Sequence, residues 1–177
     1  FNVAGSTSIC NGDFVNIVPS ALNTNSYIWS SNSNFDSSSI LTNEYVQNGV
    51  LHYQANTTGT FTYYVKAKNN NGCESNPLTV VIGVKDRPKD YSITNNNGSV
   101  CKGQNIQFVA GANGSNIQYK FWQNAAGTIP ITTGVNANLY TINTTNIDPG
   151  TYTFWANSAI NTCETVLVKV TYNVLAQ

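Results

Sequence analysis

A long segment of this 177-residue sequence occurs twice, and this duplication constrains the fold more than any other feature. Residues 9–29 read ICNGDFVNIVPSALNTNSYIW and residues 100–122 read VCKGQNIQFVAGANGSNIQYKFW. Later in each copy, residues 59–74 read GTFTYYVKAKNNNGCE and residues 150–164 read GTYTFWANSAINTCE. The two cysteines of the first copy are 63 residues apart and those of the second are 62 apart. Because a repeated sequence folds into repeated structural units, we expect two similar domains.

Both copies have the residue pattern of β-strands. Apolar and polar residues alternate, and β-branched and aromatic residues are frequent, which is typical of strands with one buried face. Clusters rich in Asn and Gly at 69–72 and 95–98 indicate turns between them. Several short strands in each repeat predict an all-β fold, with each repeat forming an immunoglobulin-like β-sandwich. The clearest predicted strands are Thr60–Lys68, Leu78–Val84, Ile117–Trp122, Thr151–Ala156 and Val166–Val174.

The only dense cluster of charged residues marks the boundary between the two repeats. Residues 85–90 read KDRPKD, and the proline among these charges favours a linker over a strand. We therefore expect one domain at 1–87 and a second at 88–177. The absence of methionine and the start at Phe1 indicate a fragment of a longer chain. We expect this fragment to be monomeric.

Aromatic residues of the repeat predict the two cores. Trp29 and Trp122 are expected to take the place of the buried tryptophan on the third strand of immunoglobulin folds. A Gly-Thr-aromatic motif opens the sixth strand, where a tyrosine often locks the corner of the fold. Alternation along this strand directs one set of side chains inward in each repeat: Phe61, Tyr63 and Val65, then Tyr152, Phe154 and Ala156.

These same motifs carry a resemblance to a known group of proteins. The Cys-x-Gly motif, the Tyr/Phe-x-Trp strand, the Gly-Thr-aromatic strand and the final Cys-Glu resemble the immunoglobulin-like and PKD-like repeats of large Bacteroidetes surface adhesins, including the SprB-type gliding adhesins. The second copy departs from the pattern at Thr162, where the first has Gly72. The resemblance implies a stalk or adhesive array at the cell surface, exported across the outer membrane by the type IX route and supporting adhesion or gliding motility.

Four cysteines suit an oxidising compartment and leave two pairings open. Cys10 with Cys73 and Cys101 with Cys163 would place one bond in each domain. However, offsets from the strand centres push the members of each pair toward opposite ends of an ideal sandwich, and Cα atoms more than about 7 Å apart cannot be bridged. A bond between Cys10 and Cys163 avoids this difficulty. Free thiols are the third alternative.

The sequence lacks the residue groups that catalysis requires. His52 is the only histidine, and the eight acidic residues are scattered singly. No Cys-x-x-Cys motif and no glycine-rich phosphate loop occurs. Asp86 and Asp90 are candidate calcium ligands in the linker, but the interleaved basic residues favour an ordinary solvated linker. We therefore expect no enzyme activity, no cofactor and no metal.

Composition and charge exclude two classes of binding partner. Charged residues make up 9% of the chain and the net charge is zero, so the surface has no field that would attract nucleic acid. No apolar run reaches the roughly 18 residues needed for membrane insertion. The remaining partners are neighbouring repeats of the same polypeptide, and polysaccharide or a solid surface.

Two functions remain after these exclusions. The first is a rod-like stalk or spacer in an extracellular adhesin at the cell surface. The alternative is a module that itself binds polysaccharide or a surface, through aromatic side chains that face outward or lie in loops. The candidate contact residues are Trp155, Tyr64, Tyr45, Tyr53 and Phe35.

Overall fold

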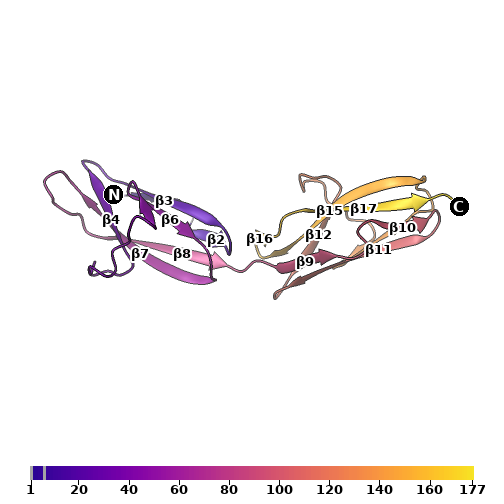
Figure 1. Ribbon diagram of the computed structural model, residues 1–177, viewed down its shortest axis with the longest axis horizontal. Coiled ribbons are helices and arrows are strands. Elements are labelled where there is room, and N and C mark those ends of the chain that lie inside the picture. The colour runs from indigo at the N-terminus through magenta and orange to yellow at the C-terminus, as the bar shows by residue number, and fades with distance from the viewer. Residues whose placement is uncertain (1, 6) are drawn as a thin grey trace. The chain divides into compact units, whose positions relative to one another are not determined.

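The structure, a computed structural model, describes residues 2–5 and 7–177. The chain divides into two compact units, Phe1–Asp86 and Arg87–Gln177, each built from strands and connecting loops (Figure 1). The division lies one residue before the expected boundary. Residues 86–88 are the whole connection between the last strand of the first unit and the first strand of the second, so the boundary can lie only within these residues. Within the described part of the chain, no helix is long and apolar enough to cross a membrane.

The first unit is a sandwich of two four-stranded sheets. One sheet has the order β1-β3-β6-β5 and the other has the order β2-β8-β7-β4. All neighbours are antiparallel except β2, which runs parallel to β8. The bounds are β1 Asn2–Ala4, β2 Ser8–Cys10, β3 Phe14–Ser20, β4 Ser26–Ser30, β5 Val46–Gln47, β6 Val50–Gln54, β7 Gly59–Lys68 and β8 Leu78–Lys85.

The second unit repeats this topology strand for strand. Its sheets have the orders β9-β11-β14-β13 and β10-β17-β15-β12, and a short strand, β16, pairs with β15. The parallel pairing recurs between β10 and β17. The bounds are β9 Lys89–Ile93, β10 Gly98–Cys101, β11 Asn105–Asn113, β12 Gln118–Trp122, β13 Val135–Asn136, β14 Leu139–Asn143, β15 Gly150–Ile160, β16 Cys163–Glu164 and β17 Val168–Leu175.

Each unit encloses its own hydrophobic core between its two sheets. Alternation along β3 and β11 buries one face of each strand, as period-2 patterning requires. Ile17 in the first domain and Phe108 in the second are fully buried at equivalent positions. The expected inward residues of the sixth strand all belong to these cores or pack against them, which confirms the prediction for β7 and β15.

The prediction for the core tryptophans is correct in one domain and wrong in the other. Trp29 is buried, with 1% of its surface exposed. In the second domain Phe121 takes this position and is 3% exposed, while Trp122 is only partly buried. Phe121 lies opposite Ala156 as Trp29 lies opposite Val65, and Trp122 is the next residue along β12, so it points to the other face of the sheet.

The corner of the sixth strand is locked by a tyrosine in the second domain only. The Tyr152 hydroxyl donates a hydrogen bond of 2.8 Å to the Asp148 carbonyl oxygen. The equivalent residue in the first domain is Phe61, which has no hydroxyl group.

Candidate functional site

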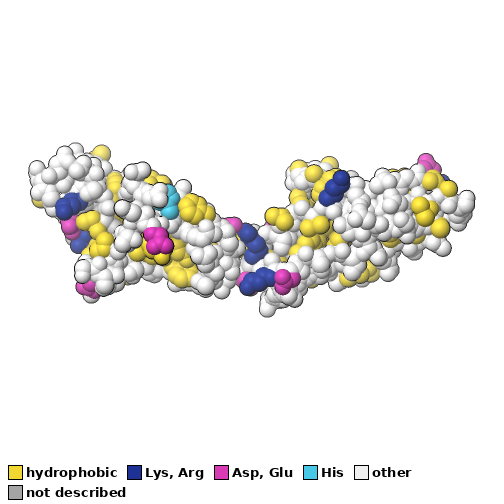
Figure 2. Space-filling model, viewed as in Figure 1, with side chains coloured by type: hydrophobic (Ala, Val, Ile, Leu, Met, Phe, Trp, Pro, Cys, Tyr) yellow, Lys and Arg dark blue, Asp and Glu magenta, His cyan; other side chains and the backbone are white. Residues whose placement is uncertain are grey.

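The main concave surface of the first domain is a groove of 770 Å³ lined by aromatic and neutral polar side chains. Its volume lies within the range of small-molecule binding sites, roughly 300–1,000 Å³. Figure 2 shows hydrophobic side chains gathered on this face of the first domain beside an acidic side chain and the histidine. We call this surface the groove; its lining residues are Phe14, Ser31, Leu41, Glu44, Tyr45, Gln47, Leu51, His52, Tyr53, Gln54, Asn56 and Tyr63.

The hairpin of β5 and β6 positions two of the candidate contact residues in the groove. Tyr45 is held by hydrogen bonds from its own N–H to the Thr42 carbonyl and from the His52 N–H to its carbonyl, at 2.9 and 2.8 Å. Its side chain is 48% exposed. Tyr53 lies on β6 and is 9% exposed, so it forms the floor of the groove and also belongs to the core.

Three further ring-bearing residues of the groove were not among the sequence candidates. Phe14 on β3 lies opposite Gln54 on β6, and its ring stacks on that of His52, two residues away along β6, with centroids 5.9 Å apart. The His52 ring is also tied to Asn16 by a 2.7 Å hydrogen bond at Nδ1. Tyr63 meets Tyr53 edge-on at 5.8 Å. Sequence patterning assigns Phe14 and Tyr63 to strand faces, but it does not show that these faces meet at a groove.

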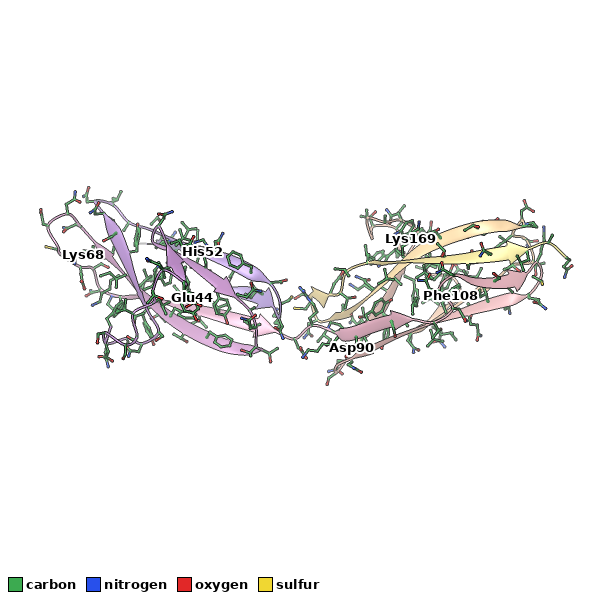
Figure 3. All side chains as sticks on the ribbon, viewed as in Figure 1. Glu44, His52, Lys68, Asp90, Phe108 and Lys169 are labelled. Atoms are coloured by element: carbon green, nitrogen blue, oxygen red, sulfur yellow. The ribbon has the colours of Figure 1, made fainter. Side chains whose placement is uncertain are left out.

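The groove carries few ionisable groups. Glu44 is the only Asp, Glu, Lys or Arg side chain among its lining residues, and Figure 3 shows it on the same side of the domain as His52. Burial raises the pKa of the Tyr53 and Tyr63 hydroxyls above its ordinary value, and for Tyr63 the neighbouring tyrosines contribute. Both hydroxyls are therefore protonated at neutral pH and can donate as well as accept hydrogen bonds.

The equivalent surface of the second domain is a smaller cavity of 300 Å³. Phe108 stands where the first domain has Ile17, and Tyr140 stands where it has Leu51. These larger rings pack against Phe154, at centroid distances of 4.9 and 5.1 Å. Tyr140 lines this cavity, and its counterpart Leu51 lines the groove of the first domain.

The other three candidate contact residues lie outside the groove. Trp155 is half-buried on β15, opposite Trp122 on β12 and between inward-facing neighbours, so it lies on the outer face of its sheet. Tyr64 occupies the equivalent position on β7 and is also half-buried. Phe35 lies in a loop, with the Lys66 ammonium 4.3 Å from its ring centroid. The groove therefore unites only Tyr45 and Tyr53 of the five candidates.

The four cysteines fall into two classes. Cys73 and Cys101 are free thiols, the first exposed and the second half-buried. Cys10 and Cys163 are disulfide-bonded. One pairing within each domain, the first of the sequence alternatives, is therefore wrong.

The strand register explains why the cysteines of one domain do not pair. Cys10 lies beside Lys85, at the end of the sandwich where β7 begins. Cys73 lies five residues beyond Lys68, the last residue of β7, and the ten residues of β7 span about 30 Å. In the second domain Cys101 lies beside Leu175, and Cys163 pairs with the last residue of the eleven-residue β15. Each separation far exceeds the roughly 7 Å that a disulfide can bridge.

The glutamate that follows each second cysteine forms an ion pair with a lysine. Glu74 is 3.3 Å from Lys66 on β7, and Glu164 contacts Lys120 on β12. Glu164 also accepts a hydrogen bond from Asn157, and Asn157 accepts one from the Trp122 ring nitrogen, both at 2.9 Å. These contacts tie the segment after the second cysteine to its sheet.

Among the described residues, no three His, Cys, Asp or Glu side chains gather into a group that could hold a metal ion. Asp90, one of the two linker aspartates, accepts a 2.8 Å hydrogen bond from Asn113.

Comparison with known proteins identifies a fold. No family model and no curated protein matches the sequence. Among solved structures, extracellular domains 3–5 of Drosophila OTK are 9% identical with a TM-score of 0.51, over 99% of this chain and 62% of that one. Fibronectin(III)-like modules of Clostridium thermocellum CbhA are 12% identical with a TM-score of 0.46, over 99% and 95%. Murine CEACAM1b is 14% identical with a TM-score of 0.42, over 97% and 96%. By its sheet orders and its likeness to the OTK domains, the chain is two tandem immunoglobulin-like β-sandwich domains.

Proposed function

We propose that this chain is a repeat segment of a large bacterial cell-surface adhesin, in which it acts as a stalk or spacer that supports adhesion or gliding. The observation that carries the proposal is the strand-for-strand equivalence of the two domains, including their cysteines. A domain whose two ends can each join a further copy is suited to an extended array.

Two further features support an extracellular spacer. A disulfide fits an oxidising compartment outside the cytoplasm. Ionisable residues are sparse and the net charge is zero, which limits non-specific attraction to charged surfaces. The partners in this function are the neighbouring repeats of the same polypeptide.

Small-angle X-ray scattering of one, two and three fused copies tests the spacer function. We expect the maximum dimension to rise by an equal increment with each added copy, because each domain would extend the chain. A maximum dimension that stays nearly constant would mean that the copies fold back on one another, and it would exclude a spacer role.

The groove favours a second function, direct binding of a neutral polysaccharide. Aromatic rings offer flat apolar faces to the C–H faces of sugar rings. The exposed rings of Tyr45 and Phe14 border the groove, and Gln47, Gln54 and Asn56 place amide groups beside them. With one carboxylate among its lining residues, the groove suits an uncharged ligand better than an anionic one.

Titration of the purified chain with a panel of neutral and acidic polysaccharides tests this second function. We expect saturable binding of a neutral polysaccharide that Tyr45→Ala weakens at least tenfold. Tyr64→Ala is the matched control, since Tyr64 lies outside the groove. No binding by any polysaccharide, or equal losses in both variants, would exclude the groove and leave the spacer function alone.

A further inference from the structure

We propose that a disulfide joins the first cysteine of each domain to the second cysteine of the domain that follows it, and that Cys73 and Cys101 are attachment sites for further copies of the repeat. Within this chain the rule pairs Cys10 with Cys163. The inference rests on the proposed function in one respect, that the chain is part of a longer array.

The chain enters and leaves each domain at opposite ends, and each end carries one cysteine. In the first domain β8 ends at Lys85, which lies beside Cys10. In the second domain β9 begins at Lys89, opposite Asn113 at the end of β11. The next residue, Gly114, lies against Ile160, which pairs with Cys163. The first cysteine therefore marks the end where the chain leaves, and the second marks the end where it enters.

The connection between the two domains is short enough to favour this pairing. Lys85 and Lys89 are the last residue of β8 and the first of β9. Four residue steps span at most about 14 Å. The tether therefore keeps the end that carries Cys10 at high effective concentration around the end that carries Cys163.

The two free cysteines complete the pattern. Cys101 is the equivalent of Cys10, because each lies beside the last residues of the parallel-paired strand. Cys73 is the equivalent of Cys163, because each precedes the glutamate that pairs with the end of the sixth strand. Cys10 and Cys163 are disulfide-bonded, whereas Cys101 and Cys73 are free thiols. By the same rule, the bonding partner of Cys101 is the second cysteine of a following domain. The bonding partner of Cys73 is the first cysteine of a preceding domain.

Formation of each bond is an ordinary two-electron oxidation. Two thiols lose two protons and two electrons and form one S–S bond. The two protons and two electrons pass to the disulfide of a thiol–disulfide oxidoreductase or of oxidised glutathione, which becomes two thiols. Each bond joins two different cysteines, one from each of two successive domains, in a head-to-tail arrangement. Such a linkage can continue from domain to domain along an array instead of forming a closed dimer.

A fusion of two complete copies tests the rule. The copies are joined directly, so that three residues, at positions 176, 177 and 1, lie between β17 and the next β1, as three lie between β8 and β9. After refolding with oxidised and reduced glutathione, remaining thiols are alkylated and disulfide-linked peptides are mapped without reduction. We expect Cys10–Cys163 within each copy and Cys101 of the first copy bonded to Cys73 of the second. Cys73 of the first copy and Cys101 of the second should be alkylated.

The matched control is the same fusion with Cys101→Ser in the first copy only. We expect Cys73 of the second copy to become alkylated, while both Cys10–Cys163 bonds remain. Bonds between Cys10 and Cys73, or random pairing that survives in the control, would overturn the rule. Scattering dimensions that rise with copy number despite such a result would leave the spacer function intact, so the two failures are distinguishable.

Discussion

At the residue scale, two tyrosine hydroxyls of the second domain differ in burial and in hydrogen bonding. The Tyr91 hydroxyl is buried and has no hydrogen-bond partner among the described residues. Burial, with a contribution from Tyr119, holds its pKa far above the usual range. Tyr152, in contrast, donates to the Asp148 carbonyl oxygen. An unsatisfied buried polar group costs about 1–3 kcal/mol, whereas a satisfied one contributes about 1 kcal/mol.

We therefore predict opposite effects for the same chemical change at these two positions. Tyr91→Phe should leave the free energy of unfolding unchanged or raise it by about 1 kcal/mol, because it removes a buried hydroxyl without a partner. Tyr152→Phe should lower it by about 1 kcal/mol, because it removes the corner hydrogen bond. Urea titrations of the two variants measure both values. A clear loss of stability in Tyr91→Phe would show that its hydroxyl has a partner.

At the element scale, the ion pair between β16 and β12 gives the second domain a pH-dependent contact. The hydrogen bond from Lys120 holds the pKa of the Glu164 carboxyl below its usual value, against the opposing effect of burial, and Asn157 adds to this shift. A lowered pKa in the folded state stabilises the fold above the unfolded pKa, near 4.3, and this contribution is lost as the pH falls through the folded value.

Glu164→Gln should accordingly be less stable than the parent chain at pH 7, by less than about 1 kcal/mol, because both partners are partly exposed. The difference should shrink below about pH 4 and vanish in stronger acid, where Glu164 is protonated. Thermal unfolding from pH 3 to pH 8 checks this prediction. A difference that does not depend on pH would assign the loss to packing or to the Asn157 hydrogen bond.

Turns between elements differ in how closely the backbone is packed. Gly134 and Gly72 both have positive φ, +72° and +85°. A Cβ atom on Gly134 would lie 2.5 Å from the Thr141 carbonyl oxygen, on the strand that it faces. A Cβ atom on Gly72 would meet no atom within 4 Å.

We predict that alanine destabilises both turns, but unequally. Gly72→Ala should cost about 1–2 kcal/mol from the left-handed backbone alone. Gly134→Ala should cost more, since either the alanine or Thr141 on β14 must move. Chemical denaturation of the two variants gives the comparison. Equal losses would mean that β14 shifts without cost.

At the scale of the whole molecule, two separate hydrophobic cores make the domains distinct stability units. Phe108 is fully buried in the second core and meets Phe154 at 4.9 Å and Tyr172 at 5.7 Å. Its replacement by alanine should destabilise that domain by about 3–5 kcal/mol. Val109, the next residue on β11, is 40% exposed, so Val109→Ala is a mild control.

Hydrogen exchange followed by mass spectrometry can assign this loss to a domain. With the disulfide reduced, Phe108→Ala should lower the protection of β11, β14, β15 and β17. The first-domain strands β3, β6, β7 and β8 should keep theirs, because none of their buried residues belongs to the second core. Loss of protection in both domains would show that they unfold as one unit.

The sequence by itself determined the duplication, the all-β class and the inward faces of β7 and β15. These are local properties, since alternation along a strand directs side chains to one face wherever the strand lies. It could not place Trp122, because the tryptophan stands one position later in its strand than Trp29 does, and adjacent residues of a strand face opposite sides. Only the tertiary structure decided the groove, since its lining residues come from separate strands and loops whose meeting depends on how the two sheets pack. The tertiary structure likewise excluded disulfides within a domain, because the length and direction of the sixth strand separate the two cysteines.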